Sequence, residues 1–335
     1  MVSTRKSRIQ KFKKNCEKKW NQYFWGFIQQ ESIDTWDWFN LSRNPNICWD
    51  IILKNPNVPW DWYCVSQNPN ITMDIIENNL DKPWNWSGVS LNPNFNIYMF
   101  FKYPEFNWNL NWISRHKSVT LDIIKKYFNC NMWTWALSLN PNLTWDFIKQ
   151  NLDWNWSWFY LSKNPNITWE IIKNNPEYPW MVTLIENPNV SVENVKSVPT
   201  LKKDRSSLNN NPNITWNDVQ NHPDVFWNYY KLSKNKNISW EIIKNNREQY
   251  WNYFDVCGFI DITFDNIRED QCLYTNIKGC SKNSFVKQKK LFFLDEYRKY
   301  LAAYKIQQWW LDLRLNPKKK IGRINIDLMY QKIFI

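Results

Sequence analysis

Apolar residues recur along most of the chain at a fixed spacing, and each copy of the pattern predicts two short helices. The clearest copy begins at Asn164 and reads N-P-N-I-T-W-E-I-I-K-N-N-P-E-Y-P-W. Thr168 can accept a backbone N–H of a first helical turn, and Ile171 and Ile172 supply the buried side of that helix. Asn and Pro then end it, and Pro179 is suited to the first position of a second helix.

The capping position of the first helix repeats every 24 residues, except for 23 residues between Thr168 and Ser191. It is filled by Cys48, Thr72, Asn96, Thr120, Thr144, Thr168, Ser191, Thr215, Ser239 and Thr263. A fixed period of this size is typical of solenoids, in which each unit buries its apolar face against its neighbours. The pattern therefore predicts an all-α fold, an elongated α-solenoid of about ten 24-residue helical-hairpin repeats, capped by a basic N-terminal helix and a C-terminal helix.

A strand is the alternative for the second element of each repeat. W-x-W alternates with a period of two, and a strand plus a helix in each repeat would give a horseshoe like that of leucine-rich repeats. Apolar residues also persist three positions apart, as in Trp62 with Val65 and Trp158 with Leu161. This spacing favours two helices per repeat.

The flanks differ from the array in charge. The net charge is +12, with eight basic residues and one acid in 1–19, thirteen and four in 282–335, and 22 and 26 in the array between them. We therefore expect a basic N-terminal arm or cap (1–19), a tryptophan-rich solenoid (20–281) and a basic C-terminal helix and tail (282–335). Ser284 can cap a helix from Phe285 to about Leu315. The N-terminal arm either covers the first repeat or binds phosphate backbones or an anionic surface.

Two groups of side chains are candidates for binding a partner. One copy lacks its tryptophans and carries a basic cluster instead, which is either a decayed repeat or a notch where an acidic partner docks. The C-terminal flank offers a tryptophan pair and a basic tail. The candidates are Lys202, Lys203 and Arg205 in the first group, and Trp309, Trp310, Lys318, Lys319, Lys320 and Arg323 in the second.

The segment before the tryptophan pair resembles the IQ motif that binds calmodulin-like proteins. Ile306 and Gln307 stand at the positions that name the motif. Leu311 stands where the motif has an arginine, which argues against a calmodulin-like partner. We prefer the interpretation that Trp309 or Trp310 packs on the last repeat.

The sequence carries no motif for catalysis or for a cofactor. His116 and His222 belong to different repeats, and no His/Cys/carboxylate set has the spacing of metal ligands. Phosphate-binding glycine loops and nucleophile elbows are also missing. We therefore expect a protein that is not an enzyme and that holds neither a cofactor nor a metal.

Cysteine usage and hydropathy bear on localisation. The seven cysteines include no C-x-x-C pair, which is typical of free thiols in a reducing compartment. No apolar run reaches the ~18 residues that a membrane span needs. The N-terminus lacks the apolar core of a secretory signal. We expect an intracellular protein that is neither transmembrane nor secreted.

The combination of N-P-N-I-T-W-[DE]-I-I, P-W-x-W and L-S resembles the tryptophan-rich repeat proteins of giant DNA viruses of the mimivirus type, from roughly Trp36 to Ser281. The resemblance implies a place in the host cytoplasm or the virion, and no particular activity. We expect a non-enzymatic scaffold for protein–protein interaction, because the chain is a repeat array without catalytic residues. The array is slightly acidic, which favours a protein partner over a phosphate backbone. The alternative is a nucleic-acid-binding or virion-associated protein that uses its basic ends.

Overall fold

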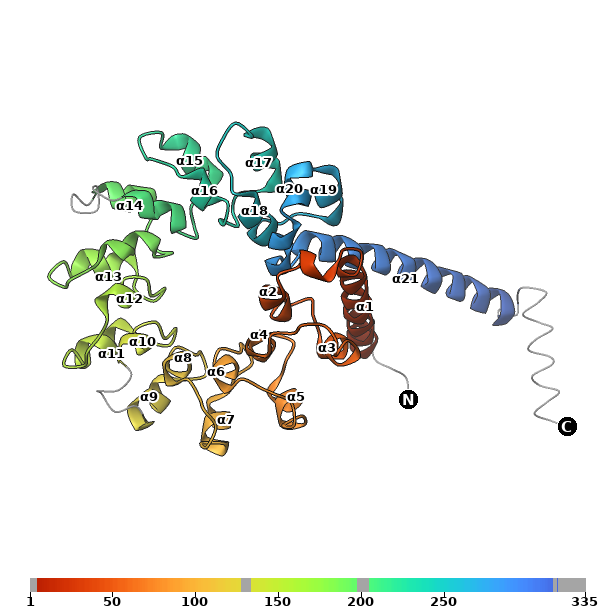
Figure 1. The fold of residues 1–335 in the computed structure, drawn as a ribbon, viewed down its shortest axis with the longest axis horizontal. Coiled ribbons are helices and arrows are strands. Elements are labelled where there is room, and N and C mark those ends of the chain that lie inside the picture. Colours follow the sequence, from red (N-terminus) through yellow and green to blue (C-terminus); the bar gives the residue numbers. More distant parts are fainter. Residues whose placement is uncertain (1–4, 128–133, 198–204, 316–317, 319–335) are drawn as a thin grey trace. The chain divides into compact units, whose positions relative to one another are not determined.

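The computed structural model describes residues 5–127, 134–197, 205–315 and 318 (Figure 1). Over these residues the chain forms helices and turns with no strand, which confirms the predicted all-α repeat solenoid and the helical second element. The chain divides into a larger unit, 24–285, and a smaller unit made of 1–23 and 286–335. The larger unit holds the repeats.

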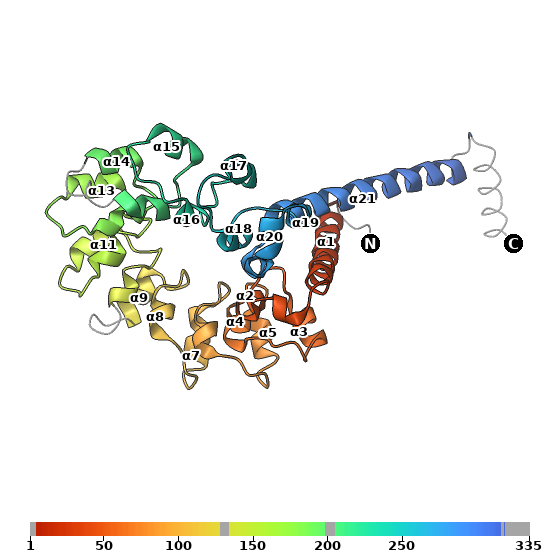
Figure 2. The same cartoon turned by 45° about the horizontal axis from the view of Figure 1, so that its top comes forward.

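Each repeat places its first helix on the outer side of the larger unit and its second on the inner side (Figures 1 and 2). The first helices are α3 (Trp49–Lys54), α5 (Met73–Glu77), α7 (Ile97–Lys102), α9 (Leu121–Tyr127), α11 (Trp145–Gln150), α13 (Trp169–Asn174), α14 (Val192–Ser197), α15 (Trp216–Asn221), α17 (Trp240–Asn245) and α19 (Phe264–Glu269). The second elements are α2 (Trp38–Ser42), α4 (Trp62–Gln67), α6 (Trp86–Val89), α8 (Leu110–Ser114), α10 (Thr134–Leu137), α12 (Trp158–Leu161), η2 (Val182–Glu186), η4 (Arg205–Asn210), α16 (Tyr229–Leu232), α18 (Tyr253–Phe259) and η5 (Ile277–Lys282). Two short elements, η1 (Ile33–Thr35) and α20 (Gln271–Thr275), lie near the two ends of the array in the sequence.

The capping residues predicted for the first helices are confirmed, with one exception. The Oγ1 atom of Thr168 accepts the N–H of Ile171 at 3.3 Å. Equivalent bonds form at Thr72, Asn96, Thr120, Thr144, Ser191, Thr215, Ser239 and Thr263. Cys48 makes no such bond, because a thiol is a weak acceptor.

The second helices begin later than predicted. Pro179 lies in the connector, and the second element of that copy starts at Val182. The indole N–H of Trp180 donates to the carbonyl of Asn175 at 2.8 Å, at the C-cap of α13. Trp60, Trp84, Trp108, Trp156, Trp227 and Trp251 make the same bond in their copies. The tryptophan stays in the connector because it satisfies a carbonyl that the helix end leaves unpaired.

The first Asn of each N-P-N turn links its repeat to the one before. The Oδ1 atom of Asn68 accepts the N–H of Asn70 at 2.8 Å, which holds the turn. Its Nδ2 group donates to the carbonyls of Ser42, Asn44 and Ile47 at 2.9, 3.1 and 3.1 Å. We call this row the asparagine spine. Its other members include Asn44, Asn92, Asn140, Asn164, Asn187, Asn211, Asn235 and Asn283, all of them buried.

A serine two residues before the spine position links its repeat to the following one, whereas the spine asparagine links it to the preceding one. The hydroxyl of Ser66 accepts the N–H of Asn85 in the next repeat at 3.0 Å. Ser42, Ser90, Ser138, Ser162 and Ser233 repeat this bond. Side chains thus satisfy the buried backbone between repeats, as short helices joined by turns require.

These bonds also join the last copy to the first. Asn44 Nδ2 donates to the carbonyls of Ser281 and Asn283, both at 2.9 Å. The N–H of Asp37 donates to the Ser281 hydroxyl at 3.0 Å. Nearby, the rings of Phe27 and Phe264 stack at 4.0 Å.

The larger unit is therefore a closed ring (Figures 1 and 2). This corrects the expectation that the solenoid is elongated. Each hairpin is rotated slightly against its neighbour, and over the array these rotations bring residues 281–285 back beside residues 37–46.

The smaller unit pairs two helices that the sequence predicted. The first part of α1 (Arg5–Ile28) packs along α21 (Val286–Leu315). The ring of Phe12 lies 4.9 Å from that of Tyr300, and the ring of Tyr23 lies 5.2 Å from that of Phe292. The order of these pairs shows that the helices run in opposite directions.

Candidate binding surface

Of the nine candidate binding residues proposed from the sequence, the structure describes four: Arg205, Trp309, Trp310 and Lys318. Arg205 begins η4 in the larger unit, and its side chain lies outside the described part of the chain. Trp309 and Trp310 are 59% and 46% exposed on α21 in the smaller unit. Lys318 is exposed. Lys202, Lys203, Lys319, Lys320 and Arg323 lie outside the described residues.

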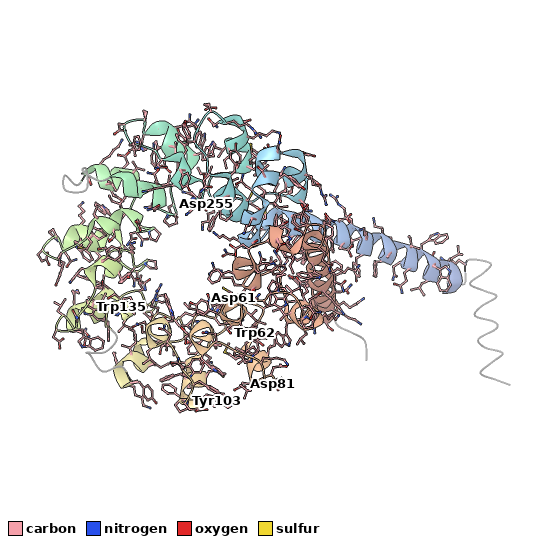
Figure 3. The ribbon with its side chains drawn as sticks, in the orientation of Figure 1. Asp61, Trp62, Asp81, Tyr103, Trp135 and Asp255 are labelled. Carbon is pink, nitrogen blue, oxygen red and sulfur yellow. The ribbon has the colours of Figure 1, made fainter. Side chains whose placement is uncertain are left out.

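The second helices share a surface that faces away from the first helices. In α2, Leu41 is fully buried, and Phe39 and Arg43, two residues to either side of it, point to the opposite face of the helix. Because the second helices lie inside the first, this face looks toward the inside of the ring. Figure 3 shows Asp61, at the N-cap of α4, and Asp255 of α18 on the inner side of the ring, and Asp81 and Tyr103 on the outer side. We call this surface the inner rim.

Aromatic rings are exposed along the inner rim. Phe39, Trp135, Phe159 and Tyr230 occupy one register of the repeat and are 45%, 43%, 42% and 59% exposed. Rings from neighbouring repeats approach each other, as in Phe39 with Tyr63 at 6.5 Å. The inner rim therefore offers flat apolar surfaces on several copies.

Cations accompany these rings. Arg43 lies 5.0 Å from the ring centre of Phe39, and Lys163 lies 4.6 Å from that of Phe159. At the C-cap of α8, Arg115 lies 4.7 Å from the ring of Trp112. Burial lowers the pKa of this guanidinium, which still carries its charge at neutral pH. Cation–π contacts of this kind hold the charges at fixed positions and contribute about 0.5–1 kcal/mol each at exposed sites.

The two kinds of helix carry charge differently. Nine of the first helices have an acid in their first turn, and most have a base in their last turn, so their charges nearly balance. Among the second elements, bases exceed acids. The bases with described side chains on or directly after them are Arg43, Arg115, Lys163, Lys231, Lys234, Lys278 and Lys282.

The few acids of the second elements are already engaged. Asp37 and Asp61 accept the N–H of Asn40 and Cys64 as helix caps, and Glu186 pairs with Lys163 at 2.7 Å. Asp255 is 5% exposed and pairs with Lys234 at 3.5 Å. Because the seven bases outnumber these acids, the inner rim is basic, although the array as a whole is slightly acidic.

Sequence analysis missed the inner rim, and the signal was present. An aromatic residue is followed four positions later by a base in Phe39 with Arg43, Phe159 with Lys163 and Tyr230 with Lys234. These pairs recur at the repeat spacing. The net charge of the array does not reveal these pairs, because acids elsewhere in each repeat cancel their charge.

Within residues 5–127, 134–197, 205–315 and 318, no group of three His, Cys, Asp or Glu side chains is placed to hold a metal ion. No helix of the described part is long and apolar enough to cross a membrane. Comparisons with protein-family models, curated proteins and solved structures find no match to this chain, so the resemblance to giant-virus repeat proteins stays a prediction.

Proposed function

We propose that the protein is a non-enzymatic scaffold whose ring holds an extended anionic partner along the inner rim. The observation that carries this proposal is the repeated pairing of exposed rings with bases on one face of successive second helices. Consecutive repeats extend such a face into a continuous binding strip. The spine and serine bonds hold the strip in a fixed geometry, which reduces the entropy that a partner loses on binding.

The charge of the inner rim changes which partner is favoured. The slight acidity of the whole array favours a protein partner over a phosphate backbone. A basic strip instead favours an acidic protein segment or a nucleic acid, and both remain within the scaffold proposal. The basic ends would add attraction that salt weakens, over a Debye length of about 8 Å at physiological ionic strength. The resemblance of the repeats supports an intracellular role, in the host cytoplasm or in the virion.

The test compares two variants of equal charge. Arg43, Lys278 and Lys282 on the inner rim are replaced by Gln in one variant, and the exposed outer-helix residues Lys54, Lys173 and Lys244 in the other. The probes are a fluorescein-labelled polyglutamate peptide and an oligo(dT) strand of matched charge. We expect the inner-rim variant to bind whichever probe the wild type binds at least tenfold more weakly than the outer variant does. The reason is that the bases removed from the inner rim face the ligand, and those removed from the outer helices do not.

Equal losses in both variants would mean that the probes bind through net charge alone, and the inner rim would not be the binding surface. Loss of all binding on deletion of 1–19 and 318–335, with both triple variants unaffected, would move the function to the basic ends.

A further inference from the structure

One member of the asparagine spine is a phenylalanine. Phe259 lies 24 residues after Asn235 and 24 before Asn283, at the spine position of its repeat. A phenyl ring cannot donate to the carbonyls of the preceding repeat as the Asn side chains do. The ring is instead 44% exposed, and the ammonium group of Lys282 lies 5.6 Å from its centre.

The other exception shows that the spine can accept a ring that hydrogen-bonds. At His116, Nδ1 accepts the N–H of Ser118 at 3.1 Å, and the side chain also bonds the backbone of Asn92. These are the two connections of a spine asparagine. Phe259 makes neither, so the junction it occupies differs from its neighbours.

A cavity of about 450 Å³ lies at this junction. It is lined by Phe259 and by Lys231, Lys234 and Lys236. The other lining residues are Asn209, Asn210, Asn211, Pro212 and Asn235. Its volume falls in the range of small-ligand sites, ~300–1,000 Å³. No carboxylate is among the lining residues, so the cavity is strongly cationic.

Three departures from the repeat meet in this cavity. Phe259 replaces the spine asparagine, Lys236 stands where most copies have the proline of N-P-N, and Lys231 stands where other copies have Asn40, Cys64 or Ala136. Lys231 is half-buried and Lys236 is exposed.

This combination matches the chemistry of a nucleotide. Ammonium groups bind phosphate, and an exposed aromatic ring is a platform on which a base stacks. A carboxylate side chain would bind the lysines but would make no stacking contact with the ring of Phe259. In a duplex the base faces are stacked on one another, so only a single strand can present one to Phe259.

We propose that the cavity holds one nucleotide of a single-stranded nucleic acid, with the base on Phe259 and the phosphate on Lys231 and Lys236. The proposal rests on the scaffold function above, because the rest of the strand would continue along the inner rim. Lys234 is partly neutralised by Asp255, so it contributes less to phosphate binding.

The test uses the full chain and fluorescence anisotropy with labelled oligo(dT), an abasic strand of the same length, and polyglutamate. Phe259→Asn restores the spine residue, so the variant should keep or raise the melting temperature. We expect it to bind oligo(dT) about tenfold more weakly, because one stacked base is lost, and to bind the abasic strand as the wild type does. Lys231→Gln with Lys236→Gln should weaken both strands and reduce the salt slope by about one, whereas Lys173→Gln with Lys244→Gln should change neither.

Unchanged binding of oligo(dT) by Phe259→Asn would overturn the base site, and the inner-rim triple variant would then decide whether the scaffold proposal still stands. Equal losses for polyglutamate and oligo(dT) in Phe259→Asn would assign the cavity to an acidic protein segment. If the wild type binds none of the three probes, both proposals fail together.

Discussion

Asparagine fits the spine because its side chain offers an acceptor and a donor at a fixed separation. In Asn164, Oδ1 accepts the N–H of Asn166 while Nδ2 donates to the carbonyls of Ser138 and Asn140. An aspartate would lose the donor, and a serine could not reach both partners. The sequence predicted a turn at every N-P-N but not a buried hydrogen bond to the preceding repeat. An asparagine that only forms a turn and one that also bonds a neighbouring repeat give the same N-P-N sequence.

Histidine at position 116 makes the spine sensitive to pH. Burial, and then the charge of Lys117, lowers the pKa of His116, against a hydrogen bond with the Asn92 backbone that raises it. The folded state therefore prefers the neutral ring, whose Nδ1 accepts from Ser118. The unfolded chain binds a proton near the ordinary value of 6.5, so stability is complete above that pH and falls as the pH drops toward the lower folded pKa.

We expect His116→Asn to remove this dependence, because the amide keeps both connections without titrating. Urea unfolding at a series of pH values between about 7.5 and 5 measures it, with His222→Asn as the control. The difference in unfolding free energy between wild type and His116→Asn should grow as the pH falls. A constant difference would show that His116 does not titrate within the spine.

The repeat pattern predicted the start of the first helices correctly, and it placed the start of the second helices too early. Thr168 and its equivalents are capping residues directly before an apolar pair, so the start of the first helix was readable. Pro179 with Trp180 resembled a helix start because proline is common there. The better signal was the residue after the tryptophan, since Asp61 and Asn252 cap the second helices with their side chains.

The connector tryptophans should stabilise the protein through their N–H group as well as their size. Trp180→Phe keeps an aromatic ring and removes the bond to the carbonyl of Asn175 at the end of α13. We expect a loss of about 1–2 kcal/mol in unfolding free energy, because that carbonyl loses its protein donor. Trp169→Phe, on the half-buried first position of the same helix, is the matched control. Equal losses in the two variants would assign the effect to ring area alone.

Closure of the ring was not predictable from one repeat. Each hairpin specifies a small rotation to the next, and whether the last copy meets the first depends on the sum over the array. One clue was available, since Ser281 and Asn283 repeat the spacing of Ser42 and Asn44 beyond the last capping residue. The inner rim depends on the same closure, because second helices can surround a common centre only in a ring.

Closure predicts that the first repeat behaves as an interior one. In an open solenoid Asn44 would belong to a terminal repeat, and its loss would cost little because terminal units fray. In the ring Asn44 bonds Ser281 and Asn283 as Asn164 bonds Ser138 and Asn140. We therefore expect Asn44→Ala and Asn164→Ala to lower the unfolding free energy by similar amounts, about 2–3 kcal/mol each, since both leave buried carbonyls unpaired.

Urea unfolding followed by tryptophan fluorescence measures both variants. As a control, Asn174→Ala on the exposed end of α13 should change the unfolding free energy little.

Hydrogen exchange gives an independent readout at the junction. The N–H of Asp37 is bonded to the Ser281 hydroxyl, so it should exchange as slowly as the N–H of Asp61, which is bonded to Ser42 inside the array. Fast exchange at Asp37, together with a small effect of Asn44→Ala, would mean that the ring is open in solution. The second helices would then line a curved strip with two ends, and a partner could bind it without passing a closed junction.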